Sequence, residues 1–179
     1  PITSIKGSME LMSSGLAGDL DEEAQQMVSI AKRNSERLLR LVNDILDLQK
    51  IEAGKIDLRL EKLDIIQTLH DAVADNRGYF EAREIDIHLL SKVDHSFLLG
   101  DRDRLMQIFS NLFSNACKYA GEDKQVALRA FEVGKEIIIE VEDHGPRIPE
   151  EFKKNIFGRF AQANNDATRK AGGTGLGLN

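Results

Sequence analysis

The sequence contains a single cysteine, Cys117, and has no long hydrophobic run. One thiol cannot form a disulfide within the chain or build a cluster of thiolate metal ligands, and it fits a reducing compartment. No apolar stretch approaches the roughly 20 residues that span a bilayer. A secretory signal is also absent. These absences argue against a disulfide-stabilised secreted domain, and we expect a cytoplasmic fragment without membrane contact.

An excess of basic charge is also missing. The 179 residues include 24 Lys and Arg against 30 Asp and Glu, for a formal net charge of −6, and both signs are well mixed. A general nucleic-acid binder would show a basic stripe, so we expect no nucleic-acid partner. A composition of 41% hydrophobic and 30% charged residues suits one or two soluble globular modules. Because the chain begins with Pro1 and stops at Asn179 within a glycine-rich motif, we expect it to be a piece of a larger protein.

The first third of the sequence predicts two helices joined by a short linker. The first, about residues 3–15, ends at Gly15, and the linker offers Asp19 or Asp21 as the N-cap of the second. The second helix covers about residues 21–53. Seven of its positions recur at the alternating spacing of a coiled-coil seam: Met27, Ala31, Asn34, Leu38, Leu41, Ile45 and Leu48.

Further apolar residues beside this seam widen the surface that must be buried: Ile30, Leu39, Val42 and Leu46. The first helix is too short and too thinly apolar to cover so wide a face alone. We therefore predict a helical hairpin that dimerises into a four-helix bundle. The alternative is a long helix that packs on its own domain.

From Gly54 onward the hydrophobic pattern changes to a period of two, which is typical of strands. Strands are predicted over residues 55–61, 84–90, 96–101, 125–131 and 136–143, and helices over about 64–78, 101–120 and a short stretch after Pro149. Strands with helices mainly between them predict an α+β sandwich. The chain thus divides into two modules, 1–54 and 55–179.

The stretch NLFSNACKY, residues 111–119, places Asn111, Asn115 and Lys118 on one helix face, because their spacings are 4 and 3. A second, apolar set is expected to face the sheet: Leu105, Ile108, Leu112 and Ala116. Amide oxygens suit Mg²⁺, and an ammonium group balances phosphate charge, so this face suits a metal-bridged phosphate. A solvated polar face is the alternative.

The stretch VEDHGPRIPEE, residues 141–151, follows a run of apolar strand residues. Asp143 stands at the strand end, where its carboxylate can accept a hydrogen bond from a base amine. Gly145 lets a ligand approach the backbone. An ordinary Asp-Gly turn is the alternative.

Two further stretches lie near the C-terminal end. IFGRF, residues 156–160, carries Phe157 and Phe160, which can anchor a mobile segment. GGTGLGL, residues 172–178, has a glycine-rich form whose backbone N–H groups can bind an anion. It matches neither the P-loop nor the dinucleotide fingerprint. A flexible linker is the alternative, but Leu176 and Leu178 argue against a solvated one.

In order and spacing, these four stretches resemble the asparagine box, first glycine box, phenylalanine box and second glycine box of sensor histidine kinases. PITSIKGSMELM, at residues 1–12, resembles the segment that follows the phosphoacceptor histidine in that family. The resemblance implies a dimerisation and phosphotransfer hairpin at 1–54. It also implies an ATP-binding domain of the Bergerat (gyrase–chaperone–kinase) type at 55–179, incomplete at its C-terminal end.

By resemblance, Asn115 would coordinate Mg²⁺, Asn111 would support the metal site and Lys118 would contact phosphate. Tyr119 would lie near the adenine, and Asp143 would accept a hydrogen bond from its exocyclic amine. The implied ATP-binding set is Asn111, Asn115, Lys118, Tyr119, Asp143, Gly145, Ile148, Phe160, Gly173, Thr174, Gly175, Leu176 and Gly177, with residues 161–172 as the ATP lid.

The function implied is that of a two-component kinase core. It would bind Mg-ATP, phosphorylate a histidine on the hairpin and relay the phosphoryl group to an aspartate of a response-regulator receiver domain. The partners implied are a second copy, through residues 1–54, and that receiver domain. An amide at Asn111 cannot serve as a general base, so transfer to a protein nucleophile is favoured over hydrolysis. The alternatives are an impaired dimeric scaffold that binds a response regulator and a Bergerat-type ATPase.

The sequence departs from the family pattern in two places. The phosphoacceptor histidine would lie five positions before Pro1, and the four histidines present stand in no matching context: His70, His88, His95 and His144. Arg147 replaces a usual glycine of the first glycine box. If the backbone there needs a positive φ, a non-glycine residue costs about 1–2 kcal/mol. The bulk of the arginine could also narrow the adenine pocket, and we expect weak ATP binding.

Overall fold

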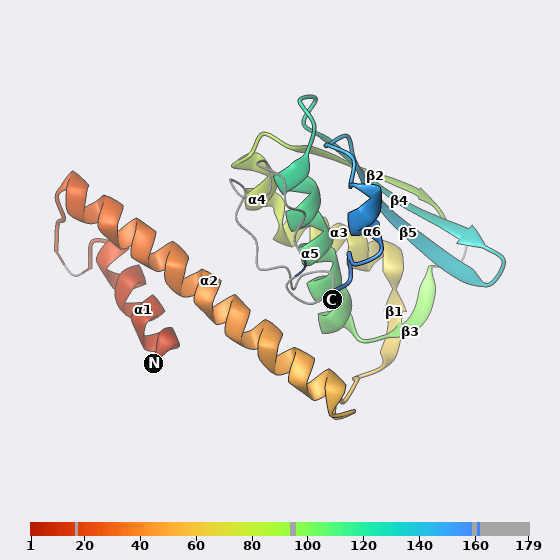
Figure 1. The fold of residues 1–179 in the computed structure, drawn as a ribbon, viewed down its shortest axis with the longest axis horizontal. Helices are drawn as coiled ribbons and strands as arrows, with labels where there is room; N and C mark the ends of the chain where they lie inside the picture. The colour runs from red at the N-terminus through yellow and green to blue at the C-terminus, as the bar shows by residue number, and fades with distance from the viewer. Residues whose placement is uncertain (17, 94–95, 159–160, 162–179) are drawn as a thin grey trace. The chain divides into compact units, whose positions relative to one another are not determined.

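The computed structural model describes residues 1–16, 18–93, 96–158 and 161. The chain divides into two compact units, Pro1–Ile56 and Asp57–Asn179. The elements, shown in Figure 1, are α1 Ile2–Ser13, α2 Glu22–Glu52, β1 Glu61–Asp64, α3 Ile65–Asp75, α4 Arg77–Glu81, β2 Asp86–Lys92, β3 Phe97–Gly100, α5 Arg102–Tyr119, β4 Gln125–Val133, β5 Glu136–Asp143 and α6 Glu150–Lys153. A helical hairpin followed by a mixed α/β unit confirms the predicted α+β fold class.

The first unit is a hairpin of two helices of unequal length. The Asp21 side chain caps α2 by accepting the Ala24 N–H at 2.8 Å, which satisfies one of the free donors at the helix start. Glu22 and Glu23 in the first turn and Lys50 in the last match the helix dipole. None of the helices in the described ranges is long and apolar enough to cross a membrane.

The short helix α1 packs on a stripe of α2 that differs from the predicted seam. The buried side chains of α2 are Val28 and Ser35, which are 6% and 9% exposed. The seam residues Met27, Leu38 and Ile45 remain 63%, 49% and 41% exposed. Because α1 has 12 residues and α2 has 31, much of α2 extends beyond its partner in the hairpin.

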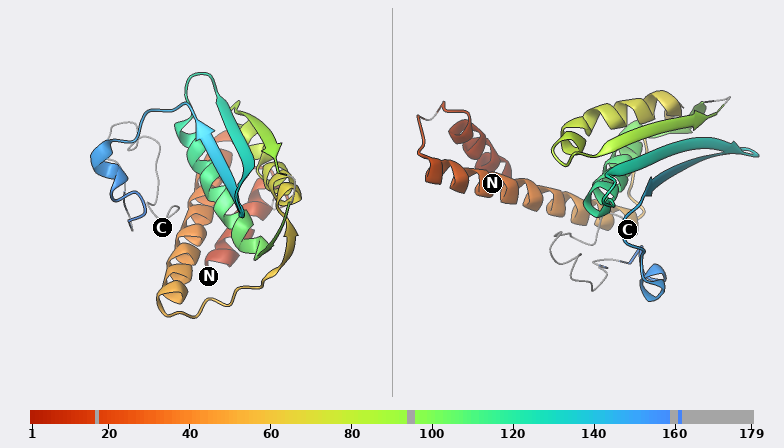
Figure 2. Two further views of the ribbon diagram at one scale, coloured as in Figure 1. Left: turned by 90° about the vertical axis from the view of Figure 1, so that its right-hand side faces the viewer. Right: turned by 90° about the horizontal axis from the view of Figure 1, so that it is seen from above.

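The second unit contains two small sheets. Strands β1 and β3 form an antiparallel pair, and a three-stranded sheet has the order β2-β4-β5. In the latter, β2 runs parallel to β4 and β5 antiparallel to β4. One face of β4 is buried through Val126, Leu128 and Ala130, which belong to one core with residues of α3 and α5. Figure 2 shows these helices alongside the sheet.

The linker at residues 55–60 is not a strand, although its alternating pattern predicted one. Strand β1 begins only at Glu61 because its partner β3 has four residues, and the register starts at Glu61 opposite Gly100. A segment that alternates with a period of two but has no neighbouring strand cannot pair its backbone donors and acceptors in a sheet. The Arg59 N–H instead donates to Asp101 Oδ2 at 2.9 Å.

The predicted helix at 64–78 is two helices, α3 and α4, separated at Asn76. The backbone there leaves the helical region, with φ −97° and ψ 4°. The Asn76 side chain donates to the Ala72 carbonyl at 2.8 Å and so satisfies one of the last acceptors of α3. Asn competes for backbone hydrogen bonds in this way, which favours a helix end.

The core face of α5 differs from the predicted apolar set. Ile108 is 51% exposed, whereas Phe109 and Phe113 are 2% and 0% exposed. The two aromatic rings carry far more apolar area than Ile108, so the helix turns them toward the core. Cys117 is also buried, and burial raises the pKa of its thiol to about 11, which makes it an inert core residue.

Candidate functional site

The helix α5 presents a polar face that the core does not use. Asp101 caps this helix by accepting the Arg104 N–H at 3.1 Å. Asn111, Asn115 and Lys118 are half-buried, one turn apart. The Lys118 ammonium lies over the Tyr119 ring, 4.9 Å from its centroid. Carboxamide oxygens are hard donors that suit Mg²⁺, so the chemistry of this face fits a magnesium–phosphate group.

The glycine stretch after β5 packs directly against the C-terminal end of α5. A Cβ built on Gly145 would lie 1.8 Å from the Tyr119 carbonyl oxygen and 2.7 Å from Asp143 Oδ1. Gly145 has no positive φ, so this position needs a glycine for space and not for its backbone conformation. The contact brings two motifs, separated by more than twenty residues in the sequence, to one place.

Asp143 is the last residue of β5 and is exposed. Its Oδ1 atom accepts the Gly145 N–H at 2.8 Å, which forms an Asx-type turn. In the sheet, Asp143 stands opposite Val126, a fully buried residue of β4. The carboxylate is therefore held at the sheet end beside α5, with an orientation set by the turn.

Sequence reasoning missed a second contact beside this turn. Nδ1 of His144 lies 2.5 Å from Oδ2 of Asp123, in the loop between α5 and β4. A Cβ built on Gly121 would lie 2.5 Å from the His144 carbonyl oxygen. No local pattern signals a pair of side chains 21 residues apart, because antiparallel pairing of β4 with β5 creates their proximity.

Arg147 and Ile148 follow this turn, and both are exposed. The only non-glycine residues with a positive φ in the described part of the chain are Glu84 and Lys124. The condition for backbone strain at Arg147 is therefore not met, and the reason for expecting weak ATP binding through strain is wrong. The side chain, not the backbone, is what distinguishes Arg147 from a glycine here.

The remaining sequence-predicted residues lie outside the described residues. They are Phe160, Gly173, Thr174, Gly175, Leu176 and Gly177, together with the predicted ATP lid at 161–172 apart from Ala161. Phe157 of the phenylalanine box is 69% exposed.

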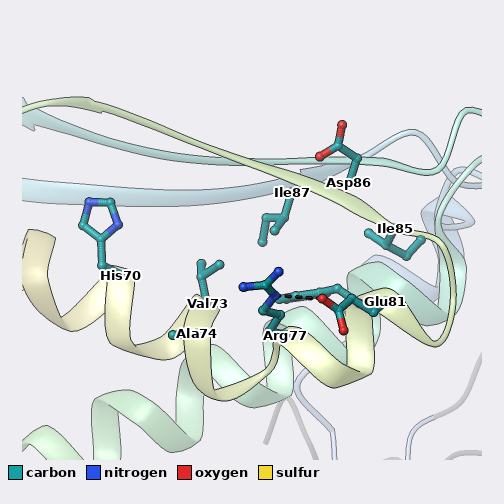
Figure 3. Close-up of a pocket in the computed structure, with 9 residues that line it drawn as sticks. His70, Val73, Ala74, Arg77, Glu81, Ile85, Asp86 and Ile87 are labelled. Atoms are coloured by element: carbon teal, nitrogen blue, oxygen red, sulfur yellow. Dashed lines mark hydrogen bonds and ion pairs between the residues drawn. The ribbon is translucent and has the colours of Figure 1, made fainter.

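Two hollows are found among the described residues, and neither coincides with the polar face of α5. Figure 3 shows the first, about 400 Å³, between α3, α4 and β2. Val73 of α3 and Ile87 of β2 line it from opposite sides, and Arg77 and Glu81, which form an ion pair at 2.7 Å, also line it. The second, about 500 Å³, is lined by Arg129, Glu140, Val141, Glu142 and Asp143. We place the candidate site by its motif chemistry, because the first hollow contains none of those residues.

Two family models match complementary parts of the chain. Residues 1–54 match the His Kinase A (phospho-acceptor) domain. Residues 100–179 match the histidine kinase-, DNA gyrase B- and HSP90-like ATPase.

Curated relatives match nearly the whole chain but are much longer. The circadian input-output histidine kinase CikA of Synechococcus elongatus is 35% identical over 99% of this chain and 24% of its own length. The sensor protein kinase WalK of Staphylococcus saprophyticus is 33% identical over 99% of this chain and 29% of its own length. The chain thus spans about a quarter of the length of these two relatives.

Solved structures share the fold. Full-length ShkA, crystallised in complex with AMPPNP, has a TM-score of 0.78 at 27% identity, covering 99% of this chain and 36% of that one. The histidine kinase ThkA, in complex with the response regulator protein TrrA, has a TM-score of 0.64 at 21% identity, covering 89% of this chain and 46% of that one. At that identity the ThkA likeness supports the fold alone.

Proposed function

The chain belongs to the sensor histidine kinase family, and on that premise we propose that it is the kinase core of a longer, cytoplasmically acting protein. In this proposal residues 55–179 bind Mg-ATP, and residues 1–54 form the part of the phosphotransfer hairpin that follows the phosphoacceptor histidine. The observation that carries the proposal is the packing of Gly145 against the Tyr119 carbonyl oxygen. That contact joins the amide face of α5 to the Asp143 turn in one place.

Each described site residue has a role that its geometry permits. The Asn115 amide oxygen would hold Mg²⁺, with Asn111 one turn away in support. When bound, Mg²⁺ would offset the negative charge of the phosphates. Lys118 would contact phosphate. Lacking a carboxylate, Asn111 cannot take a proton from water, which favours transfer to protein over hydrolysis.

The adenine end of the site would be formed by the turn and the end of α5. Asp143 accepts the Gly145 N–H through Oδ1, which leaves its second oxygen to accept a hydrogen bond from the adenine amine. Tyr119 and Ile148 would border the base. Gly173, Gly175 and Gly177 would border the phosphates, on the sequence pattern alone. Phe160, Thr174 and Leu176 complete the proposed ATP-binding set on the same ground.

The phosphoacceptor is a histidine outside these 179 residues. None of the four histidines lies within residues 1–54. His70 lies on α3, His88 on β2 and His144 in the glycine box, while His95 lies outside the described residues. We therefore expect this chain alone not to phosphorylate itself.

Two partners belong to the proposal. A second copy would cover the exposed seam of α2, because Met27, Leu38 and Ile45 have no cover within the hairpin. A response-regulator receiver domain would accept the phosphoryl group, as the family membership implies.

Two measurements test the proposed function. Calorimetric titration of the chain with ATP is expected to show binding that needs Mg²⁺, and Asn115→Ala should remove the Mg²⁺-dependent part. A longer protein that includes the residues before Pro1, incubated with radiolabelled ATP, should then carry acid-labile phosphate. Release of free phosphate without labelled protein would identify an ATPase instead. Nucleotide binding without either product would identify a scaffold.

Replacing Arg147 by glycine should change the affinity for Mg-ATP by no more than about twofold. The side chain is exposed and its backbone has no positive φ, and surface substitutions of this kind usually change free energies by about 0.5 kcal/mol or less. The check is a calorimetric titration of both proteins side by side. A tenfold gain in Arg147→Gly would mean that the arginine side chain obstructs the adenine pocket.

A further inference from the structure

Two segments of the ATP-binding unit touch at three points beside Asp143. The first is the end of α5 and its following loop, residues 119–125. The second is the glycine-box turn, residues 143–147. Gly145 approaches the Tyr119 carbonyl oxygen, Gly121 approaches the His144 carbonyl oxygen, and His144 bonds to Asp123.

Of these three contacts, one involves side chains that can change charge. Asp123 is fixed in position, since its Oδ1 atom accepts the Gln125 N–H at 3.3 Å at the start of β4. Its Oδ2 atom faces Nδ1 of His144 at 2.5 Å. The imidazole thus connects the turn that carries Asp143 to the first residue of the neighbouring strand.

Within the described part of the chain, the charged groups that shift the pKa of His144 are acidic. They are Asp123 in the α5–β4 loop, and Glu142 and Asp143 on β5. The hydrogen bond to Asp123 is the main cause that raises the pKa of His144 above its ordinary value. The same hydrogen bond lowers the pKa of Asp123. The imidazolium form is therefore favoured in the folded chain.

We propose that His144 is a positioning residue for nucleotide binding: paired with Asp123, it holds the glycine-box turn against the end of α5 and so fixes the Asp143 carboxylate. This inference rests on the proposed ATP site and adds a residue that the family pattern leaves variable. Because an imidazolium attracts the Asp123 carboxylate more strongly than a neutral ring does, nucleotide affinity depends on the protonation of His144. Asp123 stays ionised through the neutral range.

The sign of the pH dependence follows from the raised pKa. The pair is strongest at pH values below the folded-state pKa of His144 and weakens as the pH rises through it. Affinity is therefore higher on the acidic side. The side chains of His144 and Asp123 are 60% and 43% exposed, so solvent screens the pair, and an effect of about two- to fivefold on the dissociation constant is expected.

The test is a titration with Mg-ATP at several pH values from about 5.5 to about 8.5, across the range in which histidine changes charge. The dissociation constant of His144→Gln is divided by that of wild type at each pH. This ratio removes the effect of the protonation of ATP itself, which is the same for both proteins. It should be about two to five at the acidic end and approach one at the basic end. Asp123→Asn should give the same profile, and the double variant should add nothing further.

Two further variants test whether the change in nucleotide affinity comes specifically from the charge at position 144. His144→Lys keeps a cation and should bind nucleotide with a weaker pH dependence than wild type. His70→Gln is the matched control, because His70 is an exposed histidine of α3 and lies outside both segments. Its profile should equal that of wild type. A ratio of one for His144→Gln at every pH would overturn the proposal.

A measurement without nucleotide tests the pairing of His144 with Asp123 independently of the proposed function. In the nucleotide-free chain, the amide NMR signal of Gly145 should shift with the titration of His144 and stop doing so in Asp123→Asn. If ATP does not bind to wild type, the proposed function fails, and this signal still decides whether the pair holds the turn. A Gly145 signal that does not shift with the titration of His144 would refute the pairing.

Discussion

Replacing Gly145 by alanine is expected to weaken Mg-ATP binding by at least about thirtyfold and to destabilise the second unit. The added Cβ would lie 1.8 Å from the Tyr119 carbonyl oxygen, and this neighbour is backbone that cannot rotate away. Overpacking of this kind costs about 1–3 kcal/mol. To relieve it, the turn must move from α5 and carry Asp143 with it, so the adenine contact is lost, at about 2 kcal/mol for a charge-assisted hydrogen bond.

Calorimetric titration measures the loss of affinity, and chemical denaturation of the same protein measures the loss of stability. The matched control is Gly78→Ala in α4, where a Cβ meets nothing within 4 Å and a glycine is replaced by a better helix former. That variant should bind nucleotide as wild type does. Normal affinity in Gly145→Ala would show that the turn is not part of the nucleotide site.

The second large effect concerns the hairpin. The double variant Leu38→Glu with Ile45→Glu is expected to raise the dissociation constant of the proposed dimer by at least about a hundredfold. Both side chains lie on the exposed seam of α2 and would enter the core of a four-helix bundle. Burying an unpaired carboxylate there costs several kcal/mol. Sedimentation velocity over a concentration series reports the change.

Ser29→Glu provides the control for this experiment. Ser29 is an exposed residue of α2, and at 100° per residue it lies nearly opposite Leu38 and Ile45 on the helix. The same charge placed there should leave the dimer unchanged. If wild type is monomeric at all concentrations, the seam has another partner and the dimer proposal fails.

Local patterns predicted most of the elements. Period-two alternation identified the hairpin of β4 and β5, and Asp21, one of the two candidate caps in the linker, caps α2. The failures have a common cause. The linker at 55–60 alternates like a strand but has no neighbour to pair with, and Ile108 sits on an apolar pattern whose buried face is set by Phe109 and Phe113.

The candidate site, too, could be predicted from the sequence only in part. The amide face of α5 follows from spacing alone, because helical periodicity fixes which residues share a face. The absence of a positive φ at Arg147 is a property of the folded turn, and the sequence pattern left that φ open.

By itself, then, the sequence determined the family, the α+β class and the order of the motifs, because each depends on residues close together in the chain. Only the tertiary structure decided that the buried stripe of α2 runs through Val28 and Ser35 and not along the predicted seam. It also decided that Gly145 touches Tyr119 and that His144 pairs with Asp123. Such contacts depend on how distant segments pack, and steric fit between backbones decides that packing.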